Sequence, residues 1–180
     1  MKNSLRLALA LLLAAGVAAA TTVVPLTIEQ LTAVSSHVVE GRALQSWSQW
    51  NAAHSIIYTY TKFAVTRSLK GQTAGTVIVR QLGGALDGTT QRVAGVHYWV
   101  RGEQAVLFLR PGDVPDGSLV VTGTMQGNFR MRRAGGVTTV SNGAPQVSAY
   151  KMSAGTTSEY QGNTMRLQEL ETRVQKAVQP

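Results

Sequence analysis

The fold class is decided by the stretch Ser55-Ile56-Ile57-Tyr58-Thr59-Tyr60-Thr61-Lys62-Phe63-Ala64-Val65 and its continuation to Leu69. Side chains alternate between the two faces of a β-strand. One face of this stretch therefore carries Ile57, Thr59, Thr61, Phe63 and Val65. β-branched and aromatic residues dominate both faces, and such residues suit a pleated, half-buried surface. The stretch therefore predicts one long strand.

Shorter runs of the same kind recur along the chain. Gln104–Leu109 is a continuous apolar run between turn signals, which predicts a central strand buried on both faces. Residues 47–54 are polar and predict a loop. Many short strands separated by turns predict a mainly β fold, either a small antiparallel barrel of OB-like type or a sandwich. The other predicted strands span residues 37–44, 76–80, 119–124, 127–132 and 136–140.

Two helices are predicted to flank these strands. Thr27 is a candidate N-cap and Gln30 follows it at the capping-box spacing, so a short N-terminal helix is expected over residues 28–35. Residues 163–178 predict an amphipathic C-terminal helix, and residues 141–162 read as a weakly structured linker. The β-barrel domain would then occupy residues 21–140.

The first 20 residues have the layout of a cleavable signal peptide. Lys2 and Arg6 precede an unbroken Leu and Ala run, and Ala18 and Ala20 are small at the positions that cleavage requires. The apolar run is shorter than the roughly 20 residues of a membrane-spanning helix. We therefore expect cleavage near Ala20 and a secreted protein, periplasmic or extracellular, with no transmembrane segment after cleavage.

Composition narrows the function classes further. The 180 residues include no cysteine, which excludes disulfides, thiol catalysis and cysteine-ligated metals. Loss of Lys2 and Arg6 would reduce 17 basic residues to 15 and the net charge from +8 to +6. The basic residues are scattered, and a secreted protein seldom meets nucleic acid. The charge therefore favours a protein partner or an anionic envelope polymer, and no nucleic acid.

Seven segments follow one another in a recognisable order, namely Pro25–Leu31, His37–Gly41, Ile57–Tyr60, Leu69–Gly71, Val77–Gly84, Gly102–Leu109 and Gly123–Phe129. Between Leu26 and Met131 this order of features resembles a family of exported, uncharacterised bacterial proteins. It is also similar to netrin-like domains, which are OB-type barrels found among metalloproteinase inhibitors. Those inhibitors chelate the target's metal through an N-terminal Cys that this chain lacks, so the resemblance implies a fold and no inhibitory mechanism.

The sequence contains no motif that predicts a catalytic residue, a cofactor site or a metal site. His37, His54 and His97 are isolated and lack the close-spaced partners of a zinc site. The candidate partner-binding residues are two aromatic side chains in the predicted loop and the one basic cluster. They are Trp47, Trp50, Arg130, Arg132 and Arg133, with Arg130 and Arg132 on one strand face and Met131 on the other.

Three function hypotheses remain at this point. The preferred one is a non-enzymatic exported β-domain that binds a macromolecular partner or an envelope component. The second is a hydrolase with a site assembled from His54, His97 and Glu103. The third is a structural subunit of a surface assembly. If His54, His97 and Glu103 met in one cleft, the second hypothesis would gain over the first.

Overall fold

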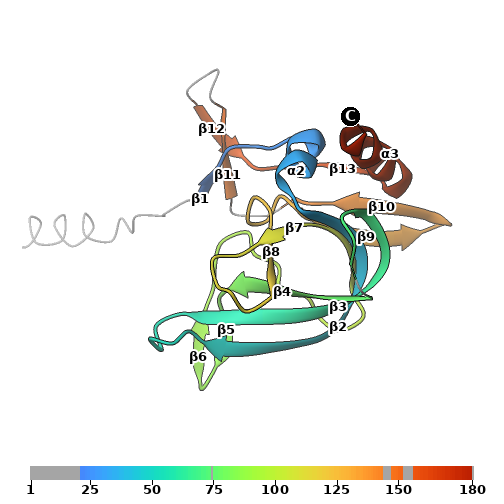
Figure 1. The fold of residues 1–180 in the computed structure, drawn as a ribbon. Coiled ribbons are helices and arrows are strands. Elements are labelled where there is room, and N and C mark those ends of the chain that lie inside the picture. Colours follow the sequence, from blue (N-terminus) through green and yellow to red (C-terminus); the bar gives the residue numbers. More distant parts are fainter. Residues whose placement is uncertain (1–20, 74, 144–146, 152–155, 180) are drawn as a thin grey trace, which may run out of the picture.

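The structure is a computed structural model that describes residues 21–73, 75–143, 147–151 and 156–179, and the predicted signal peptide lies outside them. The predicted mainly β fold is confirmed (Figure 1). In chain order the elements are β1 (Thr21–Val23), α2 (Ile28–Val34), β2 (His37–Trp50), β3 (Ile57–Lys70), β4 (Thr76–Leu82), β5 (Gly84–Leu86), β6 (Thr89–Gln91), β7 (Gln104–Pro111), β8 (Leu119–Val121), β9 (Asn128–Ala134), β10 (Val137–Ser141), β11 (Val147–Lys151), β12 (Thr156–Glu159), β13 (Thr164–Arg166) and α3 (Leu167–Val178).

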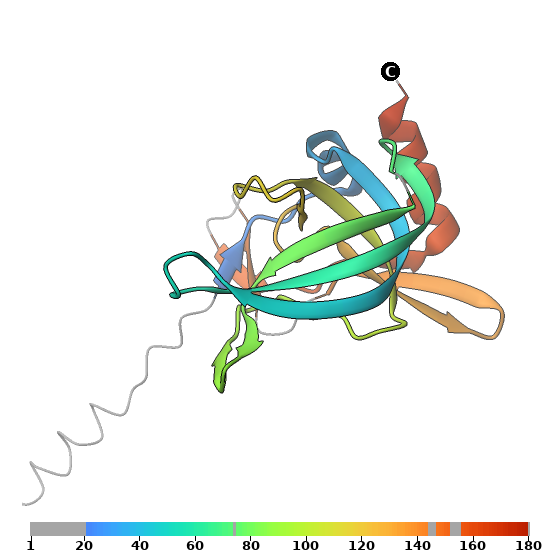
Figure 2. The same ribbon diagram turned by 60° about the horizontal axis from the view of Figure 1, so that its bottom comes forward.

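Five strands close into a barrel-like ring in the order β7-β2-β3-β4-β8. The ring closes because β8 pairs with two strands, in parallel with β4 and antiparallel with the C-terminal end of β7. The N-terminal half of β7 instead pairs with β9, from which β10 and β13 continue the sheet. Figure 2 shows the long, curved β2–β3 hairpin as part of the wall of this ring and the β9–β10 hairpin projecting from its side.

Strand β7 is buried on both faces, as the apolar run predicts. Leu107 and Leu109 face the inside of the ring, where they pack with Phe63, Val79 and Trp99. The alternating β7 residues face a second core, beneath the two helices. That core contains Ile28, Leu31, Val38, Val106, Phe108, Phe129, Val140, Leu170 and Val174. One strand therefore forms the wall between two hydrophobic cores.

The helices pack side by side over this second core. The Thr27 capping box is confirmed, because its hydroxyl accepts from the Gln30 amide and the Gln30 side chain accepts from the Thr27 amide. Helix α3 begins at Leu167 and not at residue 163, because the preceding residues pair with β10 as strand β13. Arg173 on α3 forms a two-pronged ion pair with Glu29 on α2, at 2.8 and 2.9 Å.

The predicted loop at residues 47–54 is wrong in its first half. Strand β2 runs to Trp50, and only the hairpin turn lies between β2 and β3. The inward positions at this end are serines, which do not give the apolar alternation of a strand. Ser46 pairs with Thr61 by a hydroxyl hydrogen bond of 2.8 Å, and Ser48 lies 3.5 Å from Thr59. Cross-strand hydroxyl pairs stabilise a sheet in place of apolar contacts.

Within the predicted linker 141–162, the described residues include strands that its polar sequence does not predict. It contains β11 and β12, which form a small sheet with β1, and β1 and β11 run parallel. Val147 and Tyr160 are buried there against Met125. Val147 and Tyr160 stand thirteen positions apart among mostly small and polar residues, so these two buried side chains produce no periodic pattern that the sequence could show.

A carboxyl pair lies between the sheet and α3. Glu40 on β2 is 13% exposed in its side chain, and Arg67 on β3 bridges toward both Glu40 and Glu171 of α3, at 3.8 and 2.8 Å. Burial, reinforced by the neighbouring Glu171 carboxyl and opposed by Arg67, raises the pKa of Glu40 to about 7. Folding therefore favours the protonated form of this side chain near neutral pH.

This raised pKa makes stability depend on pH. The contribution of Glu40 is fully present below its unfolded pKa of about 4.5 and is lost as pH rises through about 7. We expect the free energy of unfolding to fall by about 1–3 kcal/mol over that window, since one pKa unit corresponds to about 1.4 kcal/mol. Glu40→Gln should flatten this slope in urea titrations at several pH values. Glu169→Gln, at an exposed carboxylate on α3, is the control and should keep the wild-type slope of unfolding free energy against pH. An unchanged slope in Glu40→Gln would refute the assignment.

Candidate functional site

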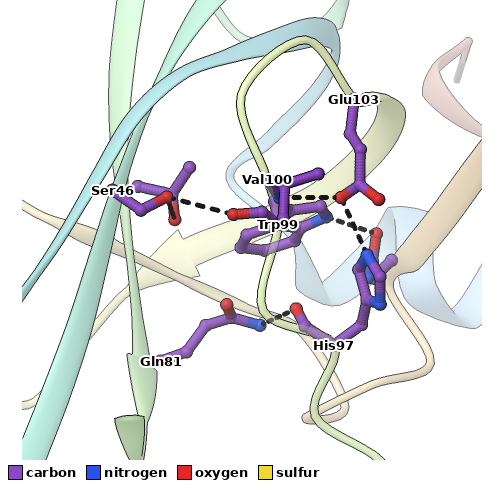
Figure 3. A network of polar contacts seen from close by, with 8 residues as sticks. Ser46, Gln81, His97, Trp99, Val100 and Glu103 are labelled. Carbon is purple, nitrogen blue, oxygen red and sulfur yellow. Dashed lines mark hydrogen bonds and ion pairs between the residues drawn. The ribbon is translucent and has the colours of Figure 1, made fainter. Parts of the chain in front are cut away.

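The connection between β6 and β7, residues 92–103, covers one end of the ring. Its anchor is Trp99, which is 3% exposed and meets Phe63 edge to face at a centroid distance of 4.9 Å. The indole N–H donates to Asn128 Oδ1 at 3.3 Å, and Ser46 donates to the Trp99 carbonyl at 3.2 Å. A large aromatic side chain thus fixes the connection to the barrel interior, as Figure 3 shows.

His97 and Glu103 come together in this connection. His97 Nε2 lies 2.9 Å from Glu103 Oε2, and the same oxygen accepts from the Val100 amide at 3.0 Å (Figure 3). The Gln81 amide group donates to the His97 carbonyl at 3.2 Å. Glu103 therefore closes the tight turn that follows Trp99 and holds His97 against it. Hydrogen bonds to an ionised acceptor are stronger than neutral ones.

Beside His97 lies an open pocket of about 460 Å³. Arg92 and Arg130 line it together with His97, and one Arg130 N–H donates to the Gly143 carbonyl at 2.8 Å. The remaining lining residues are Val93, Ala94, Gly95, Val96, Tyr98, Met125, Asn128, Asn142 and Gly143. We name this site the His97 pocket. Two guanidinium groups and an imidazole around one concavity suit an anionic ligand.

His54, the third residue of the hydrolase hypothesis, lies elsewhere. It is in the β2–β3 turn with a φ of 51°, where its ring stacks on Trp50 at a centroid distance of 6.1 Å. The Trp50 indole donates to Asp87 at 2.9 Å. Within the described part of the chain, His54 has no hydrogen bond to His97 or Glu103. The structure thus brings together two of the three residues and separates the third.

The two candidate tryptophans do not form one binding surface. Trp47 and Trp50 lie three positions apart on β2, so their side chains leave opposite faces of the strand. Trp47 stacks on Tyr60 with a centroid distance of 5.6 Å and an interplanar angle of 10°. Tyr60 in turn donates to Asp116 at 3.0 Å. Both indoles are half-buried, so part of each is occupied by contacts within the barrel.

The basic cluster is divided as well. Arg130 and Met131 lie on opposite faces of β9 as predicted, with Met131 against the helix-side core and Arg130 at the His97 pocket. Arg132 and Arg133 are exposed on the projecting β9–β10 hairpin, where Arg133 donates to Thr138 at 3.4 Å. Figures 1 and 2 place this hairpin and the tip of the β2–β3 hairpin at opposite ends of the molecule.

Sequence reasoning missed a buried arginine outside this pocket. Arg80 ends a predicted strand, where a charged side chain on the outer face is ordinarily solvated. Its side chain is 2% exposed because the connection between β7 and β8 covers it. No periodic or motif signal marks this burial, since the covering residues lie about thirty positions further along the chain.

Comparisons with protein-family models and with curated proteins give no match. Among the described residues, no helix is long and apolar enough to cross a membrane. In the same part of the chain, no group of three or more His, Asp or Glu side chains is placed to hold a metal ion.

The role of Glu103 in closing its turn can be measured. Glu103→Ala removes the acceptor of the Val100 amide and of His97, so we expect faster hydrogen exchange at Val100, with a loss of about 1–2 kcal/mol in local opening free energy. Glu103→Gln, which keeps an acceptor oxygen, should have a smaller effect. Equal exchange rates at Val100 in the wild type and in Glu103→Ala would show that the turn does not depend on this carboxylate.

Proposed function

We propose that this chain is an exported, non-enzymatic β-domain that binds an anionic component of the cell envelope in the His97 pocket. The observation that carries the proposal is the convergence of Arg92, His97 and Arg130 on one open concavity. The pocket volume, about 460 Å³, is in the range of ligand sites in general. A segment of a polymer bearing phosphate groups is the ligand class that this charge favours.

The chemistry of the lining residues supports an anion over a neutral ligand. Arginine carries a fixed charge and a planar fork of N–H donors that matches phosphate and carboxylate oxygens. Arg130 uses one N–H on the Gly143 carbonyl, which orients the guanidinium and leaves other donors for a ligand. The connection that supplies His97 is itself anchored by the buried Trp99. A site held by a packed aromatic anchor is preorganised, which lowers the entropic cost of binding.

Export and charge support an envelope ligand in particular. The expected signal peptide would deliver the protein to a compartment rich in phosphate-bearing glycolipids and wall polymers. The net charge of +6 expected after cleavage attracts such surfaces over several ångströms, more strongly at low salt. The same charge on a cytoplasmic protein would favour nucleic acid, which the expected compartment disfavours.

The hydrolase hypothesis is the second candidate, because His97 and Glu103 do make the contact of a base with its orienting carboxylate. We rank it lower for two reasons. Glu103 Oε2 also closes the turn through the Val100 amide, so a structural role accounts for it. The His97 pocket is lined by no serine, threonine or aspartate within the described residues, so no nucleophile stands beside the imidazole.

Binding of purified lipopolysaccharide and of wall teichoic acid tests the proposal. We expect Arg92→Gln and Arg130→Gln each to weaken binding by roughly tenfold to a hundredfold in calorimetric titrations, since loss of a hydrogen bond to a charged group costs about 1.5–3 kcal/mol. Arg42→Gln removes the same charge from an exposed position on β2 and is the matched control.

Wild-type affinity in both pocket variants would overturn the proposed site. Cleavage of either polymer by the wild type, lost in His97→Gln, would instead favour the hydrolase. Binding that does not saturate and that disappears at about 0.5 M salt in all variants alike would indicate a nonspecific charge effect and would also contradict the site.

A further inference from the structure

A second pocket is built around the buried side chain of Arg80. On β4, Val77 and Val79 face the ring interior, so Arg80 leaves the opposite, outer face. The guanidinium is nevertheless covered by the connection that follows β7. Gly112 permits this cover, because a Cβ there would lie 2.6 Å from Arg80 Nη2. The chain thus buries a charged side chain beneath the connection between β7 and β8.

The guanidinium is only partly satisfied by the protein. Nη2 pairs with Asp113 Oδ1 at 2.6 Å, and the carboxylate is 86% exposed. The guanidinium carbon lies 4.6 Å from the centroid of the Tyr58 ring, in cation–π contact. Arg80 Nε and Nη1 are buried and have no hydrogen-bond partner among the described residues. A buried donor without an acceptor destabilises the folded protein, and more so when the donor is charged.

Gln81 presents an unmatched acceptor at the same place. Its Nε2 donates to the His97 carbonyl, which fixes the amide orientation because only the nitrogen can donate. Its Oε1 is then the free end, and it is buried without a partner within the described chain. Arg80 and Gln81 leave opposite faces of β4, but both residues line the same pocket, so it is bordered by unpaired donors and by an unpaired acceptor.

Arg80 and Gln81 both belong to the wall of one pocket of about 360 Å³. Arg110 adds a second positive charge, so the lining carries one more cation than anion after Asp113 is counted. Thr124 lines it with a φ of 62°, a left-handed conformation that costs a β-branched residue energy and is enriched at binding sites. The apolar part of the wall is formed by Leu82, Val96, Val120 and Val121.

We propose that this Arg80 pocket binds a small hydroxylated organic anion, a phosphate monoester or a hydroxycarboxylate. Its anionic oxygens accept from the guanidinium of Arg80 and are drawn in by Arg110. Its hydroxyl group donates to Gln81 Oε1, and its carbon skeleton lies against the valines. The Arg80 pocket is separate from the His97 pocket, although Val96 lines both, and this inference does not depend on the proposed envelope ligand.

The Arg80 side-chain Nε–Hε signal in ¹H–¹⁵N NMR spectra tests this inference directly. The probes are glycerol 3-phosphate, glycerate and inorganic phosphate, with neutral glycerol as the reference. We expect a saturable shift of this signal and slower Hε exchange with at least one hydroxylated anion, at a Kd of roughly 0.1–10 mM for so small a ligand. A stronger response to glycerol 3-phosphate than to glycerate would identify the ligand class as phosphate monoesters. A stronger response to glycerate would identify it as hydroxycarboxylates.

Two variants make the test specific. Arg80→Lys keeps the charge but loses the planar donors and should weaken binding at least tenfold. Arg110→Gln changes an exposed side chain, preserves the fold, and should weaken binding about threefold to tenfold, a result that stands even if Arg80→Lys does not fold. Arg101→Gln, at an exposed arginine outside both pockets, is the control and should bind as the wild type does.

Three results would overturn the inference. They are no saturable shift with any anionic probe at about 20 mM, an equal shift with glycerol, and unchanged affinity in Arg110→Gln. The outcome is independent of the His97 pocket, because Arg130→Gln should leave the Arg80 signal and its titration unchanged. Failure of one site therefore does not count for or against the other.

Discussion

The burial of β7 on both faces is the constraint on which the rest of this structure depends. Residues 105–109 are all fully buried, with alternate side chains in the ring interior and in the helix-side core. The two faces bring together elements that are far apart in sequence. A strand with no solvated face fixes its neighbours on both sides and its register, because a shift of one residue would exchange the two cores.

Both pockets depend on the way in which one edge of β7 is divided between two partner strands. Its first half pairs with β9 and its second half with β8, so the chain turns sharply between Val121 and Asn128. Residues of that turn line both pockets, Thr124 at the Arg80 pocket and Met125 at the His97 pocket. The connection before β7 supplies His97, and the connection after it covers Arg80. Loops on a rigid scaffold are where binding residues concentrate in general.

Local sequence signals predicted the parts of the fold that local chemistry determines. The apolar run of β7, the alternation of β3 and the Thr27 capping box each agree with the structure. Trp47 and Trp50 were misplaced in a loop because the inward positions beside them are Ser46 and Ser48, whose hydroxyl pairs with the opposite strand produce no apolar alternation in the sequence. The strands within residues 141–162 depend on pairing with β1, which lies at the start of the described chain.

The candidate sites were predicted less well than the fold, since they are made by tertiary contacts. His97 and Glu103 are six residues apart, and the hypothesis of an assembled site already included their contact. That His54 lies elsewhere, in the β2–β3 turn, could be seen only in the structure. The burial of Arg80 arises from a connection more than thirty residues away and leaves no mark on its own strand. The export signal, by contrast, is a property of residues 1–20 alone and stays a prediction.

The most direct test of this account is native-state hydrogen exchange in Phe108→Ala. Truncating this side chain leaves a cavity in the helix-side core and should lower the free energy of unfolding by about 3–5 kcal/mol. If β7 joins both cores into one cooperative unit, the opening free energy of the ring amides, such as those of Val39 and Leu107, should fall by the same amount as that of Leu170 in α3. A loss confined to the helix amides, with the ring amides unchanged, would contradict the account.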